Sequence, residues 1–172
     1  MNPCALRGTD FQSTSLHPGI KNVTLNGIMP FEPLYSRLPQ LAEAETRTLI
    51  VVDRPPLPSA EYTFVEMFCN EPGRDCRRVF FTVVSSPAGR QEAVIAYGWE
   101  SVSFYRKWFK HPLPNEEIEE LRGPVLNLFS PQGEHSPAIL KLFTEVLLED
   151  PEYIERLKRH YKLFRATVER RR

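Results

Sequence analysis

The fold is decided by residues 61–99, which read EYTFVEMFCNEPGRDCRRVFFTVVSSPAGRQEAVIAYGW. Three runs in this stretch, residues 61–69, 78–85 and 91–99, are rich in Val, Phe, Tyr and Thr, which favour strands. The connections between the runs are shorter than the roughly dozen residues that a parallel crossover needs. The stretch therefore predicts an antiparallel meander. Its middle run is apolar at nearly every position, which predicts burial on both faces.

Beyond residue 100 the apolar residues recur at helical spacing instead of alternating. We expect helices over residues 101–109 and 116–122, a further helix from Ser136, and a last helix over residues 151–169. Ser136 and Asp150 are each followed by proline, a combination typical of helix starts. These helices are expected to pack on the meander.

The residues before the meander hold eight of the sixteen prolines of the chain. We expect an irregular proline-rich N-terminal arm over residues 1–58, which includes a short helix at 35–45 and a strand at 48–52. The prediction is thus one α+β domain over residues 1–172: the arm, an antiparallel meander of three to four strands (59–100), and a helical part (101–172).

Charge and composition exclude several classes of protein. The 172 residues carry 22 basic and 22 acidic side chains, so no net charge attracts the whole molecule to nucleic acid or membranes. No apolar run has the length of a signal peptide or of a membrane span. Three cysteines are too few for a disulfide framework. We therefore expect a soluble, cytoplasmic protein that does not contact membranes.

The most distinctive segment is the connection between the first two strands. Pro72 and Gly73 fit the central positions of a type II turn, which would place Cys69 opposite Cys76. Opposed residues have Cβ atoms about 4.5 to 5.5 Å apart, close enough for two thiolates to share a zinc ion or to form a disulfide. Buried cysteines are often ordinary thiols, so all three interpretations stay open.

A zinc site would need ligands beyond Cys69 and Cys76. The six residues between the cysteines exceed the usual spacing of a zinc-binding pair. Candidates for the remaining ligands are Cys4, Asp75, His17, His111, His135 and His160. The sequence predicts no other cofactor.

The C-terminal segment is the most basic part of the chain. Residues 151–172 contain eight basic and three acidic residues. Lys158, Lys162 and Arg165 share one side of the expected helix and could bind an anionic partner. Alternatively, they pair with the acidic residues between 116 and 120.

Several of these features occur together in a known set of proteins. Residues 62–69, Pro72, residues 75–78, Tyr97–Glu100 with Phe104, Tyr105 and Trp108, and Arg159–Tyr161 with Phe164 resemble an uncharacterised group of bacterial proteins. In that group a third cysteine stands where this chain has Arg74. The resemblance covers residues 61–165 and implies no assigned activity.

The chain lacks the sequence motifs of common enzyme classes, including glycine-rich phosphate loops, His-Glu-x-x-His and Gly-x-Ser-x-Gly. We expect a small non-enzymatic binding or accessory module of unknown role, contacting an anionic partner through the basic C-terminal helix. The alternative is a zinc-binding protein, structural or catalytic, that uses Cys69 and Cys76. The sequence does not define the oligomeric state.

Overall fold

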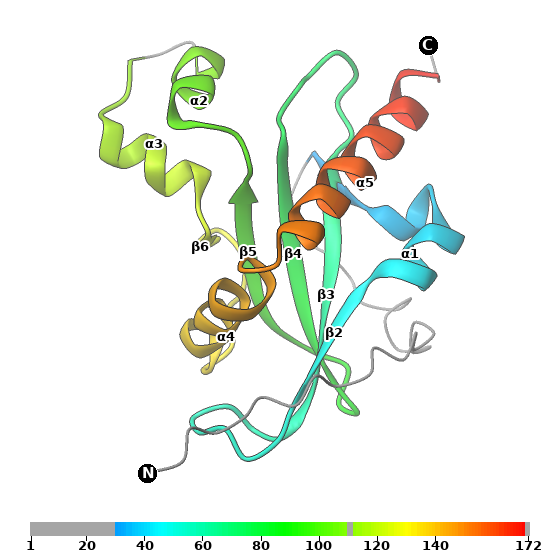
Figure 1. The fold of residues 1–172 in the computed structure, drawn as a ribbon, viewed down its shortest axis with the longest axis vertical. Coiled ribbons are helices and arrows are strands. Elements are labelled where there is room, and N and C mark those ends of the chain that lie inside the picture. Colours follow the sequence, from blue (N-terminus) through cyan, green and yellow to red (C-terminus); the bar gives the residue numbers. More distant parts are fainter. Residues whose placement is uncertain (1–29, 110–111, 171–172) are drawn as a thin grey trace.

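The computed structural model describes residues 30–109 and 112–170. These residues form an α+β fold with a six-stranded antiparallel sheet and helices that lie mostly in the C-terminal part of the chain (Figure 1). The strands are β1 (Phe31–Pro33), β2 (Arg47–Val51), β3 (Ala60–Cys69), β4 (Arg78–Ser86), β5 (Arg90–Gly98) and β6 (Val125–Leu126). The predicted fold class is confirmed.

β3, β4 and β5 form the predicted meander. β1 and β2 both pair with β3 on its edge away from β4, and β6 pairs with β5 at the other end of the sheet. The sheet has more strands than the three to four expected, because β1 and β6 were not predicted. These two strands are only three and two residues long. Strands this short leave no alternating pattern in a sequence.

The short strand β1 also changes the description of the N-terminal arm. Residues 1–58 were expected to contain one strand, and they contain both β1 and β2. The first part of the predicted arm, residues 1–29, lies outside the described residues.

The α-helices of the described residues are α1 (Pro39–Glu45), α2 (Val102–Trp108), α3 (Asn115–Arg122), α4 (Ser136–Leu142) and α5 (Pro151–Glu169), and a short 3-10 helix, Leu34–Ser36, precedes α1. A π-helical turn, Phe143–Leu147, extends α4. Asp150 caps α5 as predicted, since its side chain accepts a 2.9 Å hydrogen bond from the Glu152 amide. At α4 the first helical residue is Ser136 itself, and His135 occupies the cap position.

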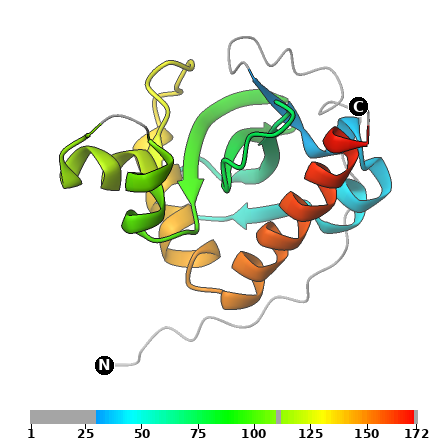
Figure 2. The ribbon, with the colours of Figure 1, turned by 90° about the horizontal axis from the view of Figure 1, so that it is seen from above.

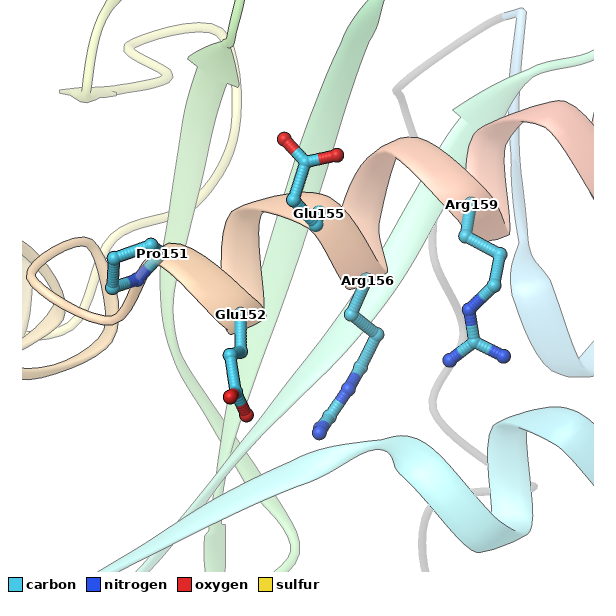
Figure 3. A pocket seen from close by; sticks show the side chains of 5 residues that line it. All are labelled: Pro151, Glu152, Glu155, Arg156 and Arg159. Carbon is cyan, nitrogen blue, oxygen red and sulfur yellow. The ribbon is translucent and has the colours of Figure 1, made fainter.

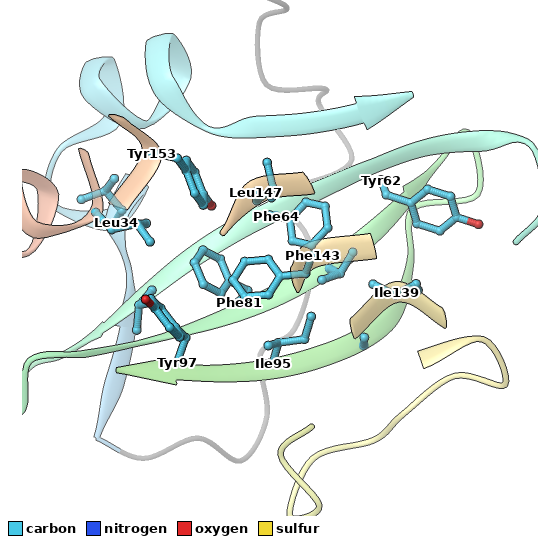
Figure 4. Packing of buried hydrophobic residues seen from close by; sticks show 14 of the residues in the cluster. Leu34, Tyr62, Phe64, Phe81, Ile95, Tyr97, Ile139, Phe143, Leu147 and Tyr153 are labelled. Carbon is cyan, nitrogen blue, oxygen red and sulfur yellow. The ribbon is translucent and has the colours of Figure 1, made fainter. Parts of the chain in front are cut away.

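The core lies between the sheet and the C-terminal helices. Viewed from above, α4 and α5 lie on the same side of a strongly curved sheet (Figure 2). Aromatic rings fill this space: Phe143 stacks on Phe64 and contacts Phe81, and Tyr153 of α5 stacks on Phe81 (Figure 4). Every residue of β4 from Val79 to Ser85 is buried, which confirms the burial predicted for both faces of this strand.

α2 and α3 pack at the β5 end of the sheet. The Tyr105 ring of α2 lies so close to Gly98 that a Cβ atom added there would be 2.2 Å from the Tyr105 hydroxyl oxygen. At the end of α3, Gly123 has a φ of 78° and lies against the Ala96 carbonyl. Two glycines therefore allow these helices to approach the strand closely.

Among the described residues, no helix combines the length and the apolar character needed to cross a membrane.

Candidate functional site

The loop that connects β3 to β4, residues 70–77, is here called the thiol loop. Its tip is a tight turn closed by a 3.4 Å hydrogen bond from the Arg74 amide to the Glu71 carbonyl. Pro72 and Gly73 occupy the central positions, and the φ of 72° at Gly73 is the left-handed value that a type II turn requires. The turn predicted from the sequence is confirmed.

The strand register differs from the expected one. Met67 lies opposite Phe80, so Cys69 is not paired with Cys76 in the β3–β4 ladder, and Cys76 lies in the thiol loop. The predicted cross-strand cysteine pair is therefore wrong. Extra residues between the turn and β4 shift the register, and Arg77 among them has a left-handed φ of 45°. The two thiols nevertheless influence each other, since a side-chain hydrogen bond between them is the largest cause of the pKa shift of each.

The hydrogen bond makes the two sulfur atoms chemically unequal. Both side chains are buried, and no disulfide joins them. The hydrogen bond from Cys76 lowers the pKa of Cys69 to about 7, with smaller help from the Glu71 backbone amide and the Arg74 charge. The same bond, together with burial, raises the pKa of Cys76. Near neutral pH, Cys69 is the sulfur that reaches the nucleophilic thiolate form.

Helix α5 holds the thiol loop from one side. The Arg165 guanidinium donates hydrogen bonds to the carbonyls of Cys69 and Glu71, at 3.1 and 2.8 Å. It also pairs with Glu169, whose carboxylate accepts a 2.8 Å hydrogen bond from the Gly73 amide. The backbone on both sides of the turn is thus tied to the last turns of α5.

A second set of contacts fixes the return of the loop into β4. Tyr161 of α5 donates a 2.7 Å hydrogen bond to the Asp75 carboxylate and accepts one from the Arg77 amide. Burial and the Asp75 contact raise the pKa of Tyr161. From α2, the Tyr105 hydroxyl donates to the Arg77 carbonyl at 2.7 Å. The Arg77 side chain forms ion pairs with Asp75 and Glu100.

The structure does not gather the predicted anion-binding residues into a free basic row. Lys158 pairs with Glu155 of the same helix at 2.6 Å, and not with the acidic segment 116–120. The Arg165 side chain is 13% exposed and faces the thiol loop. Lys162 is exposed. Anion binding by Lys158, Lys162 and Arg165 stays a prediction. The Arg165 guanidinium is already bound to the thiol loop and to Glu169.

The further zinc ligands expected beside Cys69 and Cys76 are not assembled in the described part of the chain. Asp75 already binds Tyr161, and His160 lies in a separate buried network. Within residues 30–109 and 112–170, no group of three or more His, Cys, Asp or Glu could hold a metal ion. Cys4, His17 and His111 lie outside these residues.

A buried ionisable network lies next to the thiol loop along α5. His160 Nδ1 is 2.7 Å from Glu66 Oε2 on β3, and His160 Nε2 is 3.1 Å from Glu45 Oε2 at the end of α1. Burial alone would lower the pKa of His160, but its contacts with Glu66 and then Glu45 outweigh burial and raise the pKa. The two carboxylates therefore favour the charged form of the imidazole.

The sequence analysis did not predict this network, although Glu66 and His160 each stand out in the sequence. Glu66 is the one charged residue in the apolar run from Tyr62 to Cys69. His160 lies on the same side of the last helix as Leu157 and Phe164, which form part of its apolar stripe. A charge in a buried strand and a histidine on a buried helix face each need a polar partner.

A surface hollow of about 460 Å³ runs beside the first half of α5 (Figure 3). Its cations, Arg156 and Arg159, both contact Glu45, so their charges are already balanced within the chain. The two arginines of this hollow are therefore not free to bind an anionic ligand.

Comparison with known proteins assigns no activity to this site. No protein-family model, curated protein or solved structure matches the chain.

Proposed function

We propose that this protein is a small non-enzymatic module whose thiol loop responds to oxidants by forming a reversible disulfide between Cys69 and Cys76. The observation that carries the proposal is that two buried, unbridged thiols, one on each side of the turn at Pro72 and Gly73, shift each other's pKa and leave Cys69 as the more nucleophilic sulfur. In reducing compartments, cysteine pairs that form disulfides are usually transient and redox-sensing. The loop is the part of the surface that the reaction would change.

A hydroperoxide is the oxidant class proposed. The Cys69 thiolate attacks one peroxide oxygen, the O–O bond breaks, and after protonation of the leaving oxygen the products are a sulfenic acid and water or an alcohol. The Cys76 sulfur then attacks the Cys69 sulfur, which forms the S–S bond and releases the hydroxyl with the Cys76 proton as water. Two thiols and one hydroperoxide thus give one disulfide.

Burial sets the rate of this reaction. Cys69 is fully buried and Cys76 nearly so, and exposed thiols react faster. The cover is thin, because residues 72–75 are exposed. We expect slow oxidation that is limited by opening of the thiol loop, and therefore sensitive to the contacts made by Arg165.

The test is peroxide treatment of the folded chain in a Cys4→Ser background, followed by tryptic mapping. Cleavage after Arg74 separates the two cysteines, so a disulfide links two peptides that are otherwise apart. The linked pair should appear and should be lost on reduction. Cys76→Ser should leave a sulfenic acid on Cys69, whereas Cys69→Ser should suppress oxidation at Cys76. Equal oxidation in both single variants would contradict the proposal.

Zinc binding through Cys69 and Cys76 is the competing role. Elemental analysis of the untagged, reduced protein separates the two. A stoichiometric content of zinc that is lost in Cys69→Ser would replace the redox proposal, because metal-bound thiolates are not free to form the disulfide.

A further inference from the structure

Arg78 is a half-buried arginine with no acidic partner among the described residues. It is the first residue of β4 and lies opposite Gly98 of β5. Its Nε atom is fully buried and finds no acceptor. The guanidinium lies 5.5 Å from the centre of the Phe80 ring, which balances only a small part of its charge. Burial lowers the pKa of this guanidinium, as expected for a cation without a counter-ion.

Other arginines with limited exposure are balanced by carboxylates. Arg37 pairs with Glu32 at 2.7 Å, and Arg165 pairs with Glu169. The sequence thus supplies counter-ions to arginines that are only structural. The absence of one at Arg78, within the described residues, points to a counter-ion that comes from outside the chain.

A second arginine without an acceptor lies near the same position. Arg122, the last residue of α3, also has a fully buried Nε with no partner in the described part of the chain. Gly123, which follows Arg122, lies against the Ala96 carbonyl of β5, two residues before the Gly98 that pairs with Arg78, and the charges of both arginines act on the Tyr105 hydroxyl. That hydroxyl is fixed, since it donates to the Arg77 carbonyl and lies over Gly98. Two uncompensated cations therefore share one polar neighbourhood between α2, α3 and the sheet.

We propose that Arg78, with Arg122 as a second positive charge, binds a small oxyanion, either a phosphate or a carboxylate, beside Tyr105. The planar guanidinium group matches the oxygen geometry of both anions, and its terminal nitrogens supply the donors. The proposed anion site adjoins the thiol loop, since Cys76 acts on the Arg78 charge, but anion binding there does not require the disulfide chemistry. It provides an anionic ligand with charges that are free, unlike those of Lys158 and Arg165.

Thermal unfolding with phosphate, acetate or chloride at constant ionic strength tests this proposal. A ligand that binds only the folded state raises Tm as its concentration increases. Phosphate also stabilises proteins without binding to them, so the comparison between variants decides. The rise in Tm with phosphate or acetate should be larger for wild type than for Arg78→Met. With chloride, the change in Tm should be the same for both proteins. The stronger of the two oxyanions identifies the ligand class.

Arg74→Met is the matched control, because Arg74 is exposed and pairs with Glu71. It should keep the wild-type anion response. Arg78→Lys keeps the positive charge but loses the planar pair of guanidinium donors, so it should weaken anion binding roughly tenfold in calorimetric titration. This variant replaces Arg78→Met in the test if Arg78→Met fails to fold. Arg122→Gln should also reduce affinity. An anion response that is the same in wild type, Arg78→Met and Arg78→Lys would overturn the proposal.

Discussion

His160 Nδ1 lies 2.7 Å from Glu66 Oε2, and both side chains are buried between α5 and the middle of the sheet. This contact fixes α5 immediately before the residues that hold the thiol loop, Tyr161 and Arg165. The buried pair and the candidate site are therefore mechanically connected. Disturbing the pair should loosen the loop as well as the core.

Glu66→Leu should destabilise the protein by about 3–5 kcal/mol, because it leaves the His160 charge buried without its closest partner. The free energy of unfolding in urea measures the loss. Glu155→Leu, at an exposed position of α5, is the control and should change stability by no more than about 0.5 kcal/mol. A loss at Glu66 as small as that of the control would contradict a charged buried pair.

The double variant Glu66→Leu with His160→Leu should be more stable than the sum of the single losses predicts. Removing both charges leaves neither buried alone. A double-mutant cycle from urea unfolding measures this coupling. Additive losses would mean that the two side chains do not interact.

The pH dependence of stability follows from the direction of the His160 shift. Its folded-state pKa is raised above the ordinary value of about 6.5, so its contribution is complete below about pH 6.5 and is lost as pH rises through the folded-state pKa. The stability difference between wild type and His160→Gln should therefore shrink as pH rises above about 6.5. A difference that grows with pH would show that His160 is neutral in the folded protein.

At acid pH, Glu45 should make the protein less stable as the pH falls, which is opposite to the effect of His160. Burial would raise its pKa, but hydrogen bonds from Arg159 and His160 lower it, so its contribution is present above about pH 4.5 and is lost as pH falls through the folded-state pKa. Glu45→Gln should flatten the acid limb of the stability profile. An unchanged acid limb would show that other carboxylates determine it.

Gly98→Ala should destabilise the protein by about 1–3 kcal/mol or more, because the added methyl group would overlap the Tyr105 ring. The cause is steric, so the double variant Gly98→Ala with Tyr105→Ala should recover part of the loss relative to Tyr105→Ala alone. Thermal unfolding compares the variants. A Gly98→Ala protein as stable as wild type would contradict the close packing of α2 on β5.

Arg165→Met should increase both amide exchange in the thiol loop and the rate of disulfide formation, since it removes the two hydrogen bonds to the Cys69 and Glu71 carbonyls. Hydrogen exchange at residues 70–77 and peroxide kinetics measure the two effects. Lys162→Met, on the same helix at an exposed position, is the matched control. If the two variants oxidised at the same rate, Arg165 would not control access to the thiols.

The sequence predicted the parts of the fold that depend on local patterns. The meander of β3, β4 and β5, the turn at Pro72 and Gly73, and the start of α5 at Asp150 all follow from periodicity and turn chemistry. β1 and β6 were missed because their pairing depends on where the chain returns in space, and not on a local pattern.

The candidate site was less predictable for the same reason. The turn was recognised, but the left-handed Arg77 after it was not, and the strand register shifted with it. Arg165 and the thiol loop were treated as separate features because nothing in the sequence shows that α5 returns to the β3–β4 connection. Contacts between residues about ninety positions apart depend on tertiary packing.

The disulfide itself is tested most directly by equilibrating the folded Cys4→Ser protein with reduced and oxidised glutathione in different ratios. Cys69 would attack oxidised glutathione and release one glutathione, and Cys76 would then displace the second. We expect an intramolecular Cys69–Cys76 link whose fraction rises and falls reversibly with the ratio, without accumulation of the mixed disulfide. Two separate thiols that persist in oxidised glutathione alone would contradict the account.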